Sequence, residues 1–267
     1  MASQITERDR QLLEMLAEHR VLIAEQLARH LGVSDGAAGA RLRRLARLRL
    51  LEHARIFQGQ PASVAITTRG LGLVGSPLPA PTRKLGAYRH DVGVGWVWLA
   101  ARGGAFGQLR TLHTERSMRS ADLRDDGERQ RFGVATGGLD ARGRRARHYP
   151  DLLVERADGA RLAIELELSA KGRGRLERIM RGYAGEGSIT AVLYLVADAR
   201  LESWVSAAAR RAGAAEVVVV KRLSAASLAT LALGGEARNA VQRGAARTEL
   251  RQPAVPGARH GAAEAGR

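Results

Sequence analysis

The chain has 267 residues, which is enough for two modest domains, each with its own core. It contains no cysteine, and this excludes disulfides, thiolate metal ligands and a cysteine nucleophile. The sequence has no apolar run of about 18 residues, and its first segment, MASQITERDRQ, lacks the apolar core of a signal peptide. We therefore expect a cytoplasmic protein that does not enter a membrane.

The formal net charge is +16, and only three of the 43 basic residues are lysines. A GC-rich genome would favour arginine over lysine, but it would not produce an excess of bases over acids. A charge of this size favours a polyanionic partner, with nucleic acid first and an acidic membrane surface second.

Residues 1–75 have the pattern of a small domain with three helices and a β-hairpin. ITERDRQLLEMLAEHR predicts a helix capped by Thr6, VLIAEQLARHLG a second helix ending at Gly32, and VSDGAAGARLRRLARLRLLE a third beginning near Ser34. LLEHARIF and ASVAITT predict two strands joined by the turn QGQP, and TRGLGLVG a short closing helix. This order is typical of a winged helix-turn-helix domain.

The third predicted helix carries a run of arginines without an acidic residue between Asp35 and Glu52. In winged helix-turn-helix proteins that helix lies in the major groove of double-stranded DNA. A protein–protein module is the alternative interpretation of three helices and a hairpin. The candidate DNA-binding residues are Arg41, Arg43, Arg44, Arg47 and Arg49.

The segment SPLPAPTRK, residues 76–84, predicts a semi-rigid linker. A second domain follows over residues 85–233. Residues 234–267 are rich in Ala, Gly, Arg and Pro without apolar periodicity, which predicts a disordered basic tail. Residues 119–147 are polar and rich in Gly and Arg, and we expect a long loop there.

The second domain alternates helices and strands. YRHDVGVGWVWLAAR predicts a helix, QLRTLHTERSM a strand, and YPDLLVER and RLAIELEL two further strands. LERIMRGYAGE is a predicted helix, ITAVLYLVAD a strand, RLESWVSAAARRAG a helix and AEVVVVKRL a last strand. This mixed α/β order predicts a three-layer sandwich, so the chain as a whole combines an α+β and an α/β domain.

Residues 162–169 alternate strictly, so Glu165 and Glu167 project from one face of a strand, about 7 Å apart. They are either the solvated face of an ordinary half-buried strand or part of a metal site. The four-residue turn at residues 157–160 folds the preceding strand back, which brings Asp151 toward both glutamates.

These elements resemble the PD-(D/E)XK nuclease superfamily, whose core has the order αβββαβ. Pro150-Asp151 matches the first part of its motif, and Glu165-Leu166-Glu167 matches the second. The whole chain further resembles the replication-relaxation family of plasmids and other mobile elements. The segments that carry this second resemblance are TERDRQLLEMLAEHR, the pair His90-Asp91, TERSMR, YPDLLVE, IELELSAKGRGRLERIMRGY and YLV, over roughly residues 5–222.

The resemblance implies that Asp151, Glu165 and Glu167 hold Mg²⁺ or Mn²⁺, which polarises a phosphate oxygen and activates a water molecule. Glu167 stands where the motif has lysine, and Lys171, four residues later, is the candidate replacement for that cation. Other candidates are Glu115 as a further acid, His90 and Asp91 as supporting groups, and Arg173 and Arg175 as contacts to a DNA phosphate.

Two functions follow from this reading. The first is a DNA-binding protein of a mobile element, acting in replication, mobilisation or relaxation, whose second domain has a nuclease fold and either is or is not a Mg²⁺-dependent DNA endonuclease. The second is a non-enzymatic transcriptional or replication regulator with a degenerate nuclease fold. In that case the second domain clamps DNA or pairs two copies into a homodimer.

Overall fold

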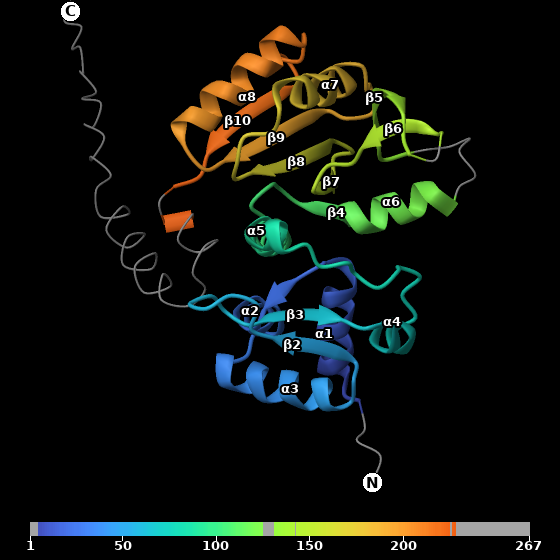
Figure 1. Cartoon of the computed structure of the whole chain (residues 1–267), viewed down its shortest axis with the longest axis vertical. Helices are drawn as coiled ribbons and strands as arrows, with labels where there is room; N and C mark the ends of the chain where they lie inside the picture. The colour runs from blue at the N-terminus through green and yellow to red at the C-terminus, as the bar shows by residue number, and fades with distance from the viewer. Residues whose placement is uncertain (1–4, 125–130, 142, 225, 228–267) are drawn as a thin grey trace, which may run out of the picture.

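The computed structural model describes residues 5–124, 131–141, 143–224 and 226–227. These residues form a mixed α+β structure with eight α-helices, one short 3₁₀ helix and three sheets (Figure 1). No helix within the described ranges combines the length and the apolar character needed to span a membrane. The predicted disordered tail, residues 234–267, lies outside the described residues.

The first unit follows the predicted order of elements. It consists of α1 (Glu7–Glu18), β1 (Leu22–Ile23), α2 (Ala24–Leu31), α3 (Asp35–Arg47), β2 (Leu51–Ala54), β3 (Ser63–Ile66) and α4 (Thr68–Val74). Its three-stranded antiparallel sheet has the order β1-β3-β2. Residues 22–23, which we had predicted as the beginning of the second helix, form β1 instead.

Local capping signals fix the helix ends of the first unit. Thr6 caps α1 in a reciprocal capping box with Asp9, and Ser34 accepts a hydrogen bond from the backbone N–H of Ala37 at the start of α3. Gly32 ends α2 in a left-handed conformation, with a φ of 64°.

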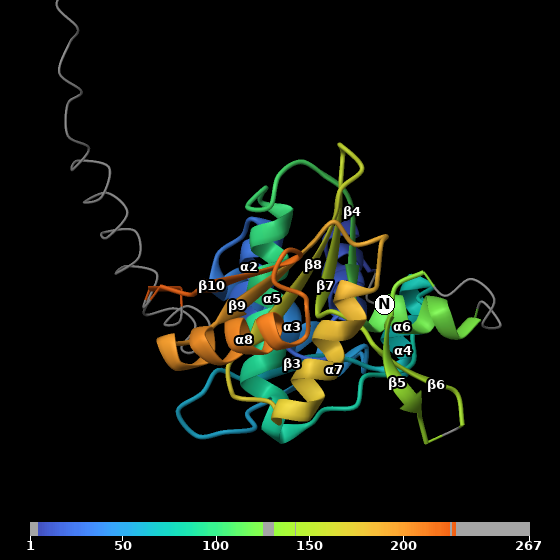
Figure 2. The same cartoon turned by 90° about the horizontal axis from the view of Figure 1, so that it is seen from above.

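The second unit is built on a five-stranded mixed sheet. Its elements are η1 (Leu85–Ala87), α5 (Tyr88–Arg102), β4 (Leu109–Thr114), α6 (Glu115–Arg124), β5 (Val134–Leu139), β6 (Arg145–His148), β7 (Leu152–Arg156), β8 (Arg161–Glu167), α7 (Arg173–Ala184), β9 (Ala191–Val196), α8 (Ala199–Arg211) and β10 (Val218–Arg222). The sheet order is β10-β9-β8-β7-β4, with β8, β9 and β10 parallel and β7 antiparallel to both neighbours. In Figures 1 and 2, α7 and α8 cover one face of this sheet and α5 covers the other.

Two predictions for the middle of the chain were wrong. The strand predicted from QLRTLHTERSM ends at Thr114, and helix α6 begins at Glu115. A reciprocal pair of hydrogen bonds causes this change, because the Thr114 hydroxyl accepts from the Ser117 N–H at 3.3 Å while the Ser117 hydroxyl accepts from the Thr114 N–H at 3.0 Å.

The loop predicted over residues 119–147 contains the end of α6 and a two-stranded antiparallel ribbon, β5–β6. The buried carboxylate of Asp122 accepts hydrogen bonds from three consecutive N–H groups, those of Arg131, Phe132 and Gly133, at 2.9 to 3.3 Å. This contact anchors the entrance of the ribbon. Residues 125–130 and 142 of the predicted loop lie outside the described residues.

Helix α5 joins the two units into one continuous core. Its Val97 and Trp98 belong to a single buried cluster with Leu22 and Leu27 of the first unit and Leu152 of the sheet. The segment between the units also packs, because Leu78 is buried and Arg116 donates a hydrogen bond to the Pro79 carbonyl at 2.6 Å.

The contact between α2 and α5 depends on Gln26 and Gly95. The fully buried Gln26 amide accepts from the Ile23 N–H at 3.0 Å and donates to the Val92 carbonyl at 2.7 Å. A Cβ atom on Gly95 would lie only 2.6 Å from both the Gln26 Nε2 and the Leu22 Cδ2. A side chain at this position would therefore force the buried side chains of Gln26 and Leu22 to move.

We predict that Gly95→Ala lowers the free energy of unfolding by about 1–3 kcal/mol, because it overpacks this contact. Gly72→Ala is the matched control, since Gly72 also lies in a helix but its Cβ would meet nothing within 4 Å. The control should leave stability equal to or slightly above that of the unchanged protein. Urea unfolding measures both, and equal stability of the two variants would contradict the close contact.

Candidate nucleic-acid interface and carboxylate cluster

Helix α3 presents one exposed face of small and basic side chains. Ala38, Leu42 and Leu45 are buried beneath it. The exposed residues Ala37, Ala40, Arg43 and Arg47 follow the helical spacing of three and four on the opposite side. We call these four residues the α3 face. Arg49, just beyond the helix, is also exposed and has a positive φ of 59°.

Two other arginines of α3 bind an internal acid. Arg41 Nη1 lies 2.5 Å from Asp9 Oδ1, and Arg44 Nη2 forms an ion pair with Asp9 Oδ2. The Asp9 side chain is fully buried and also accepts hydrogen bonds from the N–H and hydroxyl of Thr6. The five arginines proposed from the sequence therefore divide into Arg43, Arg47 and Arg49, which are exposed, and Arg41 and Arg44, which fasten α3 to α1.

The pKa of Asp9 reflects these contacts. Burial alone would raise it, but the hydrogen bonds from Thr6, Arg44 and Arg41 lower the pKa from 3.8 to about 2. A carboxyl group whose pKa is lowered by folding stabilises the protein above its unfolded pKa, and this stabilisation is lost as the pH falls through the folded pKa.

We predict that Asp9→Asn lowers the free energy of unfolding at pH 7 by about 2 kcal/mol, as expected for losing hydrogen bonds to a charged group. The difference from the unchanged protein should shrink as the pH falls from about 4 toward 2, because the Asp9 carboxyl becomes neutral there. Chemical unfolding across this range measures it, with the exposed Glu14→Gln on the same helix as control. A difference that is constant with pH would refute the idea that the charged Asp9 carboxylate holds α3 against α1.

The register of β7 against β8 places Asp151 next to Glu165. Leu152, the first residue of β7, pairs with Ile164 of β8. Asp151, which comes just before Leu152, is therefore a neighbour of Glu165, which comes just after Ile164. Asp151 Oδ2 accepts a hydrogen bond from the Leu166 N–H at 2.8 Å and lies 3.1 Å from His90 Nε2. The Asp151 carboxylate thus closes the end of the strand pair and touches α5.

Glu165 and Glu167 are buried, with exposed fractions of 1% and 5%. The solvated-face alternative for this strand was therefore wrong. The physical reason is that α7 covers the face from which both glutamates project, while α5 packs against the other face. From Ala163 to Glu167 the alternating residues are buried on both sides of the strand.

Glu165 is held by two side chains that the sequence did not single out. Its Oε1 lies 2.5 Å from His148 Nε2 and accepts a hydrogen bond from the Tyr183 hydroxyl. Burial would raise the pKa of Glu165, but His148, Lys171 and Tyr183 lower it below its usual value. The only sequence signal for His148 is its position two residues before Pro150-Asp151.

Glu167 pairs with Lys171, whose Nζ lies 2.7 Å from its Oε2. Burial, reinforced by the charges of Glu165 and Asp151, raises the pKa of Glu167 above its usual value although Lys171 opposes the shift. The pKa of Lys171 is raised too, because Glu165, Glu167 and Asp151 outweigh its own burial. All three carboxylates therefore act on one ammonium group.

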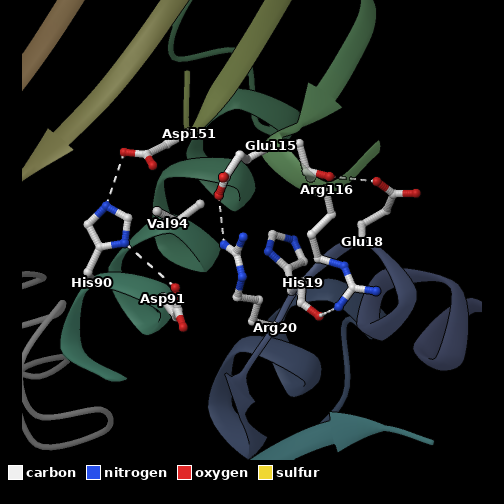
Figure 3. A pocket seen from close by; sticks show the side chains of 10 residues that line it. Glu18, His19, Arg20, His90, Asp91, Val94, Glu115, Arg116 and Asp151 are labelled. Atoms are coloured by element: carbon white, nitrogen blue, oxygen red, sulfur yellow. Dashed lines mark hydrogen bonds and ion pairs between the residues drawn. The ribbon is translucent and has the colours of Figure 1, made fainter. Parts of the chain in front are cut away.

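A small cavity of about 20 Å³, room for roughly one water molecule, lies at the junction of the two units (Figure 3). Arg20 of the first unit pairs there with Glu115 at 2.8 Å. Burial would lower the pKa of His90, but Asp151 and Asp91 raise it to about 10, so His90 is a cation. Glu115, His90, Asp91 and Asp151 all line this cavity, whereas Glu165, Glu167 and Lys171 do not.

The carboxylates agree in chemistry with a site for Mg²⁺ or Mn²⁺, since both ions prefer oxygen ligands. Three acids with buried or half-buried oxygens lie at adjacent strand ends, and their mutual repulsion would be relieved by a cation. Each acid nevertheless has its own partner. Asp151 contacts His90, Glu167 pairs with Lys171, and Glu165 contacts both His148 and Tyr183. In the part of the chain that the structure describes, no three His, Asp or Glu side chains are arranged to hold a metal ion.

Arg173 and Arg175, the predicted phosphate contacts of the second unit, are exposed in the first turn of α7. Arg173 Nε donates to Glu177 Oε1 at 3.1 Å, and Arg211 donates to the same oxygen at 2.7 Å. Arg173 is therefore partly neutralised, while Arg175 projects from the same turn.

Comparison with models of known protein families found no match to this chain, and a search among curated proteins found no similar sequence either.

Proposed function

We propose that this chain is a DNA-binding protein that contacts double-stranded DNA through the α3 face. The observation that carries the proposal is the separation of the arginines of α3, with Arg43 and Arg47 exposed on one side and Arg41 and Arg44 bound internally on the other. The unit's order of helices and strands, with its sheet order β1-β3-β2, supports a winged helix-turn-helix domain.

In a helix-turn-helix the first residues of the second helix approach the base edges. Here those residues are Asp35, Gly36, Ala37 and Ala40 of α3, and Asp35 is the only one of the four with a side chain that can form hydrogen bonds to bases. Arg43 and Arg47 follow in the second half of α3, where they are suited to phosphate contacts. We therefore expect binding that is strongly salt-dependent and tolerant of DNA sequence.

The hairpin of β2 and β3 supports the same proposal, because it forms a wing beside α3. Its exposed Arg55 is available to the DNA backbone. The wing is fastened to the second unit, since the Tyr88 hydroxyl donates to the Pro61 carbonyl at 2.8 Å and Phe57 packs edge-on against the Tyr88 ring. The resemblance to replication-relaxation proteins adds a plasmid or other mobile element as the setting, in replication, mobilisation or relaxation.

The DNA-binding proposal predicts that Arg43→Ala/Arg47→Ala weakens binding to duplex DNA. The slope of log affinity against log salt should fall by about 2 units, because two phosphate contacts are lost. Arg200→Ala/Arg210→Ala on α8 removes the same charge from exposed positions and should leave the slope almost unchanged. Fluorescence anisotropy in a salt titration measures both, and equal slopes for the two variants would refute a role of the α3 face.

A second candidate function is Mg²⁺-dependent DNA cleavage. The series α5, β4, β7, β8, α7, β9 supports it, because it follows the αβββαβ order of PD-(D/E)XK nucleases, with α6, β5 and β6 inserted between β4 and β7. Asp151, Glu165 and Glu167 would hold the ion, which would polarise a phosphate oxygen, and Lys171 would stabilise negative charge. The partner already held by each acid favours instead the non-enzymatic regulator, in which the second unit serves as a DNA clamp or a dimerisation platform.

Metal binding separates these two alternatives. If the carboxylates hold Mg²⁺, the ion raises the Tm of the unchanged protein, and Asp151→Asn removes this rise. Asp158→Asn, in the exposed turn before β8, is the control and should keep it. The same proteins are incubated with supercoiled plasmid to detect nicking. If Mg²⁺ neither raises the Tm nor supports nicking, the nuclease alternative is excluded and the non-enzymatic regulator remains.

A further inference from the structure

A second basic surface lies on the other unit, between the β5–β6 ribbon and α7. An open groove of about 750 Å³ separates them. Thr136, Gly137, Gly138 and Leu139 line it from the ribbon, and Arg178 and Arg181 line it from the helix. We call it the ribbon groove.

The groove exists because the ribbon touches α7 at one end and bends away from it at the other. A Cβ on Gly182 would lie 2.5 Å from the Ala135 carbonyl oxygen, so helix and strand are in direct contact there. Beyond Ala135 the pairing of β5 with β6 shifts in register, and Gly137 and Gly138 have positive φ values of 76° and 74°. The strand thus leaves the helix and opens a space between them.

The charges of the ribbon groove have one sign. Its lining contains two arginines and no acidic side chain. Glu177, the nearest acid on α7, is occupied by Arg211 at 2.7 Å and Arg173 at 3.1 Å, and lies 3.7 Å from Arg181. On the opposite wall of the groove, Gly137 and Gly138 have no side chains that would block a phosphate group. Paired guanidinium groups beside such a wall suit a phosphodiester backbone.

We propose that the ribbon groove binds a second DNA duplex, so that one copy of the chain bridges two DNA segments. Helix α3 lies at the lower end of the long axis in Figure 1, whereas α7 and the β5–β6 ribbon lie toward the upper end. Surfaces at opposite ends of the molecule face different DNA segments. This inference rests on the proposed DNA binding through α3 and adds to it a second contact and a bridging activity.

The test uses the full chain and two short duplexes, one labelled with a donor dye and one with an acceptor. The unchanged protein should bring them together and give energy transfer. Arg178→Ala/Arg181→Ala should abolish the transfer while single-duplex binding through α3 persists. Arg200→Ala/Arg210→Ala is the matched control and should bridge as well as the unchanged protein. Circular dichroism and Tm confirm that each variant is folded.

The outcomes distinguish the two proposals. If the protein binds no duplex, the proposed function itself fails. If it binds one duplex but never bridges, or if Arg178→Ala/Arg181→Ala bridges as well as the control, the ribbon groove is not a DNA site and the α3 proposal stands. Bridging through a homodimer with two α3 faces would be lost in Arg43→Ala/Arg47→Ala but kept in the groove variant, and that pattern also overturns the inference.

Discussion

Helix α5 is the element on which both units depend, because it has no solvated side along most of its length. One side packs on β1 and α2, and the other packs on β4, β7 and β8. Its glycines allow this approach: Gly93 and Gly95 are both buried, and Gln26 bonds to the α5 backbone beside them. Removing the first unit would expose Val97 and Trp98, and removing α5 would expose Leu22 and Leu27. The two units are therefore one folded body, although each has its own sheet.

The same arrangement brings Asp151, Glu165 and Glu167 close to polar and basic side chains of several other elements. Burying a carboxylate is costly unless a partner compensates it, and each acid of the cluster has one. The partners come from four elements: His90 from α5, His148 from β6, Tyr183 from α7, and Lys171 from the segment before α7. A protein gains little stability from such an assembly compared with an apolar core. Removing any one partner would nevertheless leave a buried charge without compensation and destabilise the fold.

Most elements could be predicted because their signals are local. Thr6, Gly32 and Ser34 mark helix ends through contacts within a few residues, and the hairpin of β7 and β8 follows from its short turn. The predicted secondary structure was wrong where hydrogen bonds to residues distant in the sequence, or competing local hydrogen bonds, determine the conformation. The ribbon after α6 depends on Asp122 binding three N–H groups nine to eleven residues away, which no periodicity indicates.

The candidate sites show the same limit. Alternation in residues 162–169 identified the strand, but it could not tell a solvated face from a face covered by α7. The sequence also treated the five arginines of the third helix as equivalent. Their spacing contained more information, because Arg41 and Arg44 lie three residues apart on the side that faces α1, while Arg43 and Arg47 lie four apart on the exposed side. Finding the difference required knowing that Asp9 is buried.

The ion pairs of Asp9 with Arg41 and Arg44 affect the entropy that the protein loses when it binds a partner. Because Arg41 and Arg44 already hold α3 against α1, the orientation of the helix is set before any partner arrives. Little backbone entropy is then left to lose on binding, in contrast to a basic segment that folds onto its target. The charges of Arg41 and Arg44 are partly neutralised by Asp9, but their contacts fix the helix that carries the exposed Arg43 and Arg47. For the proposed binding to DNA, association should accordingly be that of a rigid body, with a rate set by long-range electrostatic attraction rather than by refolding.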